Sequence, residues 1–138
     1  MELSSWLMMN DEERKLQQEV RFFVKEDVDR RFLKEMDEDK VRYPREFLEK
    51  AASRSLLGLR FPEQYGGRSM PWVSEIIALE EVGVLVTSLG CLYSLVSIVR
   101  EAIDKFGSEH LKKKYLQPTL EGRLTFAEAE QENEKIYE

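Results

Sequence analysis

The sequence has 138 residues, a formal net charge of −6, one cysteine and one histidine, which suits a single compact domain. An acidic chain disfavours nucleic acid as a partner, and one cysteine with one histidine can form neither an internal disulfide nor a structural zinc cluster, so we expect no metal site. No apolar run approaches the ~20 residues that cross a bilayer, and the acidic amino terminus lacks a targeting signal, so we expect a cytoplasmic protein without membrane insertion.

An apolar content of 42% with only 7 Gly and 4 Pro favours long helices, and we expect an all-α bundle of about five or six helices. The first helix should begin after Asn10, whose side chain can cap the acidic turn that follows. One apolar stripe then recurs at spacings of three and four and should pack into the core: Leu16, Val20, Phe23, Val24 and Val28. Residues 29–42 predict a short helix or turn around Phe32, Leu33 and Met36.

The next helix should start at Pro44, whose missing amide hydrogen is harmless in a first turn, and should end before Gly58. Its buried face would be Phe47, Leu48, Ala51 and Ala52. Residues 56–67 read LLGLRFPEQYGG, in which apolar residues surround a glycine and a proline and the segment closes on a flexible glycine pair. We expect a packed, irregular loop there.

A helix opening at Pro71 has almost no polar face and should therefore be central and buried. Glu80 falls within its apolar stripe, where a carboxylate needs an ion-pair or hydrogen-bond partner. Arg60 is the candidate partner. We interpret Glu80 as a member of a structural ion pair in preference to a catalytic base.

The following helix should run over residues 88–106, with Ser88 as its cap and with Gly107 ending it in the left-handed conformation. It carries two apolar stripes. The larger side chains form one, Leu89, Leu92, Val96, Val99 and Ile103, and smaller or slightly polar ones form the other, Cys91, Ser94, Leu95, Ile98 and Ala102. Two separate surfaces must therefore be covered.

A short basic helix should follow from Ser108 and Glu109 through residues 112–115, until Pro118 interrupts it before Gly122. The last segment, TFAEAEQENEKIYE, spaces Thr125 and Glu128 as in a capping box, which predicts a weakly packed helix that frays or docks on another chain. His110 is expected at the surface. The basic run at residues 112–114 could attract a CoA phosphate, although a solvated turn is the more ordinary interpretation.

Cys91 could act as a nucleophile only with an activating base, and the single histidine lies in a different, polar helix. A packing or pocket-lining thiol is therefore favoured. No carboxylate stands out as a catalytic base, because most occur on faces expected to be exposed.

Three ordered motifs, LLGLRFPEQYGG, IIALEEVGVLVTSLG and FGSEHLKKKYLQPTLEGRLTFAEAE, make residues 10–130 resemble the amino-terminal domain of acyl-CoA dehydrogenases. The resemblance implies an extension at residues 1–9, a helical domain at 10–124 and a divergent tail at 125–138. It also implies FAD-dependent α,β-dehydrogenation of acyl-CoA thioesters by a three-domain protein. In that family the helix resembling residues 88–106 lines the acyl cavity, so Cys91, Ser94, Leu95 and Ile98 would face the ligand.

The sequence departs from the family's pattern after residue 128. Ala129 and Glu130 stand where the family has Thr-Glu, and residues 131–134 replace its Gly-rich turn. Neighbouring carboxylates there would repel a phosphate, so no FAD-binding residue is carried over, and FAD is not expected on this chain alone. The family's catalytic glutamate lies in the carboxy-terminal domain, so no catalytic residue is assigned.

Two functions remain open from the sequence. One is a domain of a flavin-dependent dehydrogenase that is inactive alone and associates as a homo-oligomer. The alternative is an acyl-chain-binding or assembly subunit that complements a partner polypeptide. A helical interaction module unrelated to lipids fits the ordered motifs less well.

Overall fold

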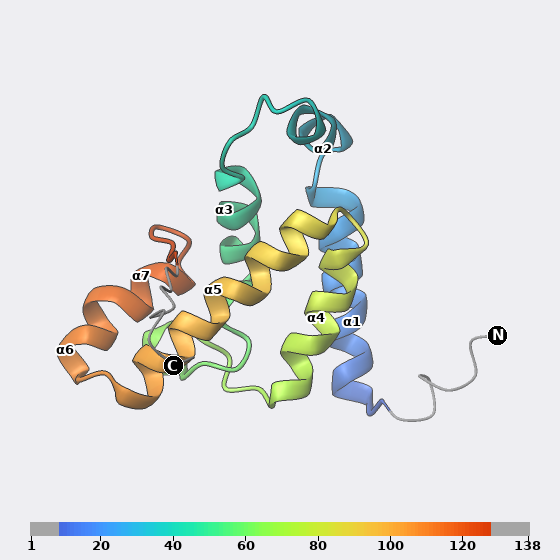
Figure 1. Ribbon diagram of the computed structural model, residues 1–138. Helices are drawn as coiled ribbons and strands as arrows, with labels where there is room; N and C mark the ends of the chain where they lie inside the picture. The colour runs from blue at the N-terminus through green and yellow to red at the C-terminus, as the bar shows by residue number, and fades with distance from the viewer. Residues whose placement is uncertain (1–8, 128–138) are drawn as a thin grey trace, which may run out of the picture.

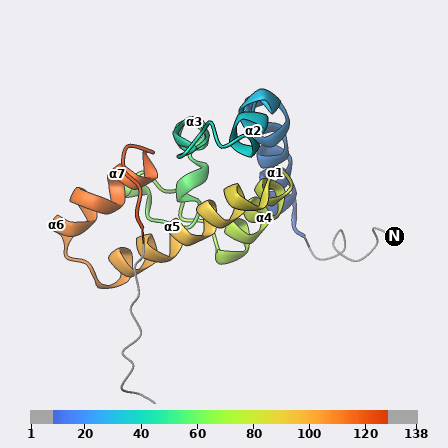
Figure 2. The same ribbon diagram turned by 45° about the horizontal axis from the view of Figure 1, so that its top comes forward.

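The computed structural model describes residues 9–127, and these form helices with no strand, which confirms the expected all-α class (Figure 1). The α-helices are α1 (Asp11–Phe22), α2 (Arg30–Asp37), α3 (Arg45–Ser53), α4 (Trp72–Gly83), α5 (Thr87–Phe106), α6 (Glu109–Leu111) and α7 (Gln117–Leu120). Wider π-helical turns span Phe23–Asp27 and Lys112–Leu116, and tight 3-10 turns span Leu56–Gly58 and Glu63–Tyr65. Helix α1 lies beside α4, and α6 and α7 lie at the opposite end of α5 (Figures 1 and 2).

The amino-terminal cap of α1 forms as predicted. The Asn10 side chain accepts a hydrogen bond from the Glu13 amide, and the Glu13 carboxylate accepts one from the Asn10 amide, both at 2.9 Å. This capping box satisfies two amides that have no partner within the helix. Every member of the predicted apolar stripe, from Leu16 to Val28, is buried.

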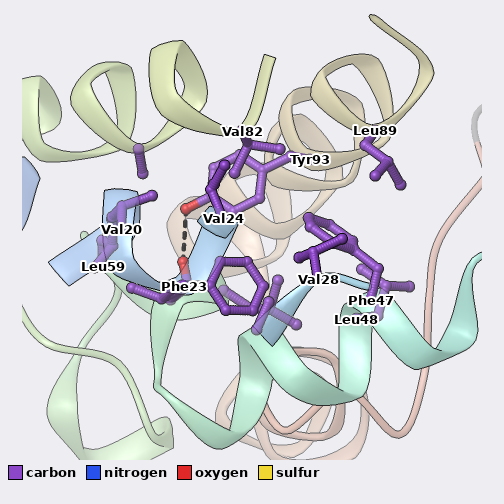
Figure 3. Close-up of a cluster of buried hydrophobic side chains, with 14 of the residues drawn as sticks. Val20, Phe23, Val24, Val28, Phe47, Leu48, Leu59, Val82, Leu89 and Tyr93 are labelled. Atoms are coloured by element: carbon purple, nitrogen blue, oxygen red, sulfur yellow. Dashed lines mark hydrogen bonds between the residues drawn. The ribbon is translucent and has the colours of Figure 1, made fainter. Parts of the chain in front are cut away.

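The core lies between α1, α3 and the inner faces of α4 and α5 (Figure 3). Its centre includes Val20, Phe23, Phe47, Leu89 and Tyr93, and the rings of Phe23 and Phe47 meet at a centroid separation of 5.7 Å. A smaller cluster of Phe61, Tyr65, Leu116 and Leu120 joins the loop after α3 to α7.

The segment LLGLRFPEQYGG is packed and irregular, as predicted, but its glycine pair is fixed in place. Gly66 has a φ of +93°, and a side chain at Gly67 would overlap the carbonyl of Phe61. The loop closes through backbone hydrogen bonds from Arg68 to Gly58 at 2.9 Å and from Met70 to Leu59 at 2.8 Å.

Three predictions about helix ends are wrong. Helix α5 begins at Thr87 after Val86, and Ser88 is an exposed first-turn residue that caps nothing. Gly107 is extended (φ −76°, ψ 145°), because its amide still donates to the Ile103 carbonyl at 2.8 Å and no left-handed residue is needed. Pro118 does not interrupt the last helix, since it falls in the first turn of α7, where an amide hydrogen is dispensable.

The predicted boundary of α3 is close to the observed one, with Pro44 directly before the helix. The predicted short helix at residues 29–42 is α2, which buries Phe32. Thr125 is not helical, and the rest of the helix predicted after it lies outside the described residues.

Candidate functional site

Helix α5 has a buried inner face that is fixed by hydrogen bonds, here called the locked face, and a solvent-exposed outer face, here called the open face. Its inner face buries Leu89, Gly90, Tyr93, Val96, Ser97 and Arg100. The opposite face is the second predicted stripe, here called the α5 outer stripe: Cys91, Ser94, Leu95, Ile98 and Ala102. Four of these five residues are exposed, and Ser94 is half-buried, donating its hydroxyl to the Cys91 carbonyl at 3.1 Å.

Hydrogen bonds hold the inner face of α5 to its neighbours. The Tyr93 hydroxyl donates to the Leu56 carbonyl at 2.6 Å (Figure 3), and the Arg100 guanidinium donates to the carbonyls of Leu57 and Thr119 at 3.0 and 2.9 Å. Burial raises the pKa of Tyr93 and lowers the pKa of Arg100 to about 10. Because these groups bond to two separate segments, they fix the rotation of α5 and so the direction of its outer stripe.

Arg60 is the centre of a second polar cluster. Its Nε donates to the Glu75 carboxylate at 2.5 Å, and its Nη2 donates to Glu101 at 2.9 Å and to the Ser97 hydroxyl at 3.2 Å. Its guanidinium also lies over the Trp72 ring, 4.0 Å from the centroid. The cluster ties the loop to both α4 and α5.

The predicted Arg60–Glu80 pair is therefore wrong, because Glu80 is exposed. Helix α4 is rotated so that Ser74, Glu75, Ile77, Ala78, Glu81 and Val82 face inward. Glu75 takes the place predicted for Glu80, and Glu81 pairs with Arg21 through two hydrogen bonds of 2.7 and 3.0 Å. Sequence reasoning missed Tyr93 and Arg100, although their spacing around Ser97 repeats every three or four residues and could have shown that they share the inner face of α5.

The prediction that α4 is buried all round is also wrong. Its outward residues Trp72, Val73, Ile76 and Val84 are exposed, the last at 78%. Helix α4 packs against α1 and α5 on one side only, so an apolar helix is left half open. This α4 outer face is a second exposed apolar surface, besides the α5 outer stripe.

The remaining candidate groups are spread apart. Cys91 is exposed near the start of α5, and the other end of this helix at Phe106 lies about 22 Å away along the axis at 1.5 Å per residue. His110 is exposed on α6, beyond that end. No thiol–imidazole pair forms between them. Lys112 lies 3.7 Å from the Asp104 carboxylate, and Lys113 and Lys114 are exposed.

Gly67 does not form a cradle for a cofactor, although Gly66 beside it faces open space. The space beside Gly67 is filled by the carbonyls of Phe61 and Gly58, so its backbone approaches its own loop and not an open site. The carboxylates beside Arg60 are ion-paired within the cluster. Residues 9–127 therefore present an apolar surface, the α5 outer stripe, whose orientation is fixed by the buried hydrogen bonds of α5.

The fold and the site together define an all-α domain in which one face of α5 is buried and hydrogen-bonded and the opposite face is exposed and largely apolar. The sequence model of the acyl-CoA dehydrogenase N-terminal domain matches residues 10–123, and the chain belongs to this family.

Similar proteins include the short-chain-specific acyl-CoA dehydrogenase of Clostridium acetobutylicum, 32% identical over 112 residues, which are 80% of this chain and 29% of that protein. A probable acyl-CoA dehydrogenase of Bacillus subtilis is 32% identical over 117 residues (83% and 31%). Mitochondrial isovaleryl-CoA dehydrogenase of Bos taurus is 26% identical over 115 residues (83% and 27%). The chain thus spans less than a third of the length of these relatives. Within residues 9–127, no helix is both long and apolar enough to cross a membrane.

Proposed function

We propose that this chain is the acyl-facing helical domain of an FAD-dependent acyl-CoA dehydrogenase, with its α5 outer stripe as one wall of the cavity for the acyl chain. Cys91, Ser94, Leu95 and Ile98 would contact the ligand. The domain itself would occupy residues 10–124, between an extension at 1–9 and a tail at 125–138. The observation that carries the proposal is the open, uncharged face of a helix whose other face is fixed by buried hydrogen bonds.

The shape of the stripe supports a hydrocarbon ligand. Leu95 and Ile98 are each 54% exposed on consecutive turns, and no charged side chain interrupts the stripe between Cys91 and Ala102. Ligand cavities are mostly apolar with a few polar groups, and Ser94 supplies a small hydroxyl within the stripe. Such a wall packs against the methylene groups of an acyl chain but does not select for a particular functional group on that chain.

Dehydrogenation needs a base for the α-proton and a flavin that accepts the β-hydride. The carboxylates of Glu75 on α4 and Glu101 on α5 are both ion-paired with Arg60, and Asp104 on α5 lies 3.7 Å from Lys112. At Gly67 the backbone packs against carbonyls of its own loop and leaves no room for a flavin. We therefore propose that this chain is inactive alone and that flavin and base belong to other protein segments.

The α4 outer face would serve assembly. Exposed Trp72, Val73 and Ile76 form an apolar surface of the kind that drives association, so we propose homo-oligomer contacts or contacts with a complementing polypeptide.

A second candidate is an acyl-chain-binding or assembly subunit with no part in oxidation. The same open stripe favours it. Pull-down from extract of the source cell separates the two candidates, since a subunit should retain a stable partner polypeptide, whereas calorimetry against acyl-CoA should detect binding under both.

The single exposed thiol provides a direct test, because Cys91 lies on the proposed wall. We expect octanoyl-CoA to slow alkylation of Cys91 by iodoacetamide, whereas free CoA should not. A Cys91→Ala, Ser53→Cys variant, whose thiol lies on α3, should show no protection. Unchanged alkylation at millimolar octanoyl-CoA contradicts the acyl wall. Visible flavin absorbance or acyl-CoA oxidation by the purified chain contradicts its inactivity.

A further inference from the structure

A surface hollow of about 460 Å³ lies between the α2–α3 connection and the start of α5. Its lining includes Arg42 and Tyr43 from the connection and Ser88 and Leu92 from the first two turns of α5. In Figure 1 the connection passes above the amino-terminal end of α5. The hollow therefore sits at one end of the helix that carries the outer stripe.

The hollow is in line with the α5 outer stripe. Leu95 follows Ser88 by seven residues, which places both on one side of the helix, and Leu92, which packs against the core, lies at the edge of that side. From Ser88 to Ile98 the helix rises about 15 Å at 1.5 Å per residue. A chain lying on the stripe and extending toward the amino-terminal end of α5 would enter the hollow.

Three polar groups of the hollow make no hydrogen bond or ion pair among residues 9–127: the Arg42 guanidinium and the hydroxyls of Tyr43 and Ser88. The Arg45 guanidinium lies 5.8 Å from the Tyr43 ring centroid, and Tyr43 also interacts electrostatically with Arg100 and lines a second, smaller hollow beside Gly122. The carboxylates of Asp37 and Asp39 complete the polar lining. These free groups are available to a ligand.

The balance of charge decides which ligand suits the hollow. One guanidinium faces two carboxylates, so an anionic chain end would meet a net negative lining. A hydroxyl both donates and accepts, and the lining offers donors and acceptors together. Apolar walls from Met36, Val41 and Leu92 would surround the carbon chain just before that group.

We propose that this hollow receives the far end of an acyl chain lying on the α5 outer stripe and favours an uncharged, hydroxyl-bearing end. The proposal rests on the proposed function, because it needs the stripe to hold an acyl chain. The substrate class it names is a long acyl-CoA hydroxylated at the terminus.

The experiment is a titration of the full ¹⁵N-labelled chain, followed by amide NMR, with dodecanoyl-CoA and 12-hydroxydodecanoyl-CoA as probes. Amides of the stripe report on the acyl wall, and amides of residues 42, 43, 88 and 92 report on the hollow. We expect the hydroxylated probe to bind about three- to tenfold tighter, as one or two net hydrogen bonds allow, and to shift the hollow amides further. A Tyr43→Phe, Ser88→Ala variant should lose this preference but keep its affinity for dodecanoyl-CoA, while Ser53→Ala on α3 should retain the preference.

The outcomes separate the two ideas. Stripe amides that shift equally with both probes, while the hollow amides stay still, overturn the hollow and leave the acyl wall standing. No shift with either probe overturns both. A preference that survives the double variant also refutes the role of the two hydroxyls.

Discussion

Two neighbouring residues of α5 offer a matched test of its two faces. Leu95 is 54% exposed on the outer stripe, and Val96 is 3% exposed on the inner face. We consider Leu95→Ala and Val96→Ala, which remove three and two carbon atoms from adjacent positions of one helix. Both introduce the same residue, so the helix propensity of the product is matched.

The structure predicts that Val96→Ala, which loses fewer carbon atoms, lowers the free energy of unfolding more than Leu95→Ala does. At about 0.8 kcal/mol per buried methylene, Val96→Ala loses roughly 1.6 kcal/mol of transfer free energy, and a cavity term brings the total to about 2 kcal/mol. Leu95→Ala removes carbons that are already about half solvated, and water fills the space. Its effect should be about 1 kcal/mol or less. Alanine has a higher helix propensity than either starting residue, which offsets roughly a few tenths of a kcal/mol in both variants.

The measurement is urea unfolding followed by far-UV circular dichroism, with Cys91 protection by octanoyl-CoA as the second readout. Leu95→Ala should reduce protection while nearly preserving the free energy of unfolding, and Val96→Ala should do the reverse. Equal destabilisation by both variants refutes the division of α5 into a locked and an open face. Full protection in Leu95→Ala removes that side chain from the acyl wall.

Three further predictions concern the scaffold behind the stripe. Gly67→Ala should destabilise by about 3 kcal/mol or more in urea unfolding, since its methyl group would overlap a backbone carbonyl, whereas Gly83→Ala faces open space and should be neutral or stabilising; equal effects would contradict the packing of the loop. Arg100→Met should cost about 2 kcal/mol, because two buried carbonyls lose their donor while a desolvated charge is removed, and an unchanged urea midpoint would show that these hydrogen bonds add nothing. The pKa of Glu101 is lowered, first by the hydrogen bond from Lys105, so its contribution to stability is present above about pH 4.5 and is lost as the pH falls through its lower folded-state pKa. Glu101→Gln should flatten the acid limb of a stability–pH curve, and an unaltered limb would rule out this contribution.

Periodic patterns predicted the helices well where one residue type dominates a face. The stripe from Leu16 to Val28 is buried, and the capping signal at Asn10 is realised in full. Both depend on interactions within one or two turns, which the local sequence specifies. The separation of two stripes on α5 is likewise a property of helical geometry.

The orientation of α4 could not be predicted in the same way. Apolar residues occur on all sides of this helix, so their periodicity does not indicate which side faces the core. That side depends on the segments that pack against the helix. Arg21 on α1 and Arg60 in the loop draw Glu81 and Glu75 inward, which turns Glu80 and Trp72 outward. The arginine partners of Glu81 and Glu75 are 60 and 15 residues away in the sequence, so the local sequence of α4 does not show which face turns inward.

The sequence by itself determined that this chain is helical, where most helices begin, and that α5 has two apolar faces, because these follow from spacing, capping and side-chain polarity within a few turns. Only the tertiary structure decided which face is locked. Tyr93 and Arg100 reach carbonyls on segments distant in sequence, and those buried hydrogen bonds fix the rotation of the helix. A buried polar group must find its partner wherever the chain brings one, and that position is a property of the whole fold.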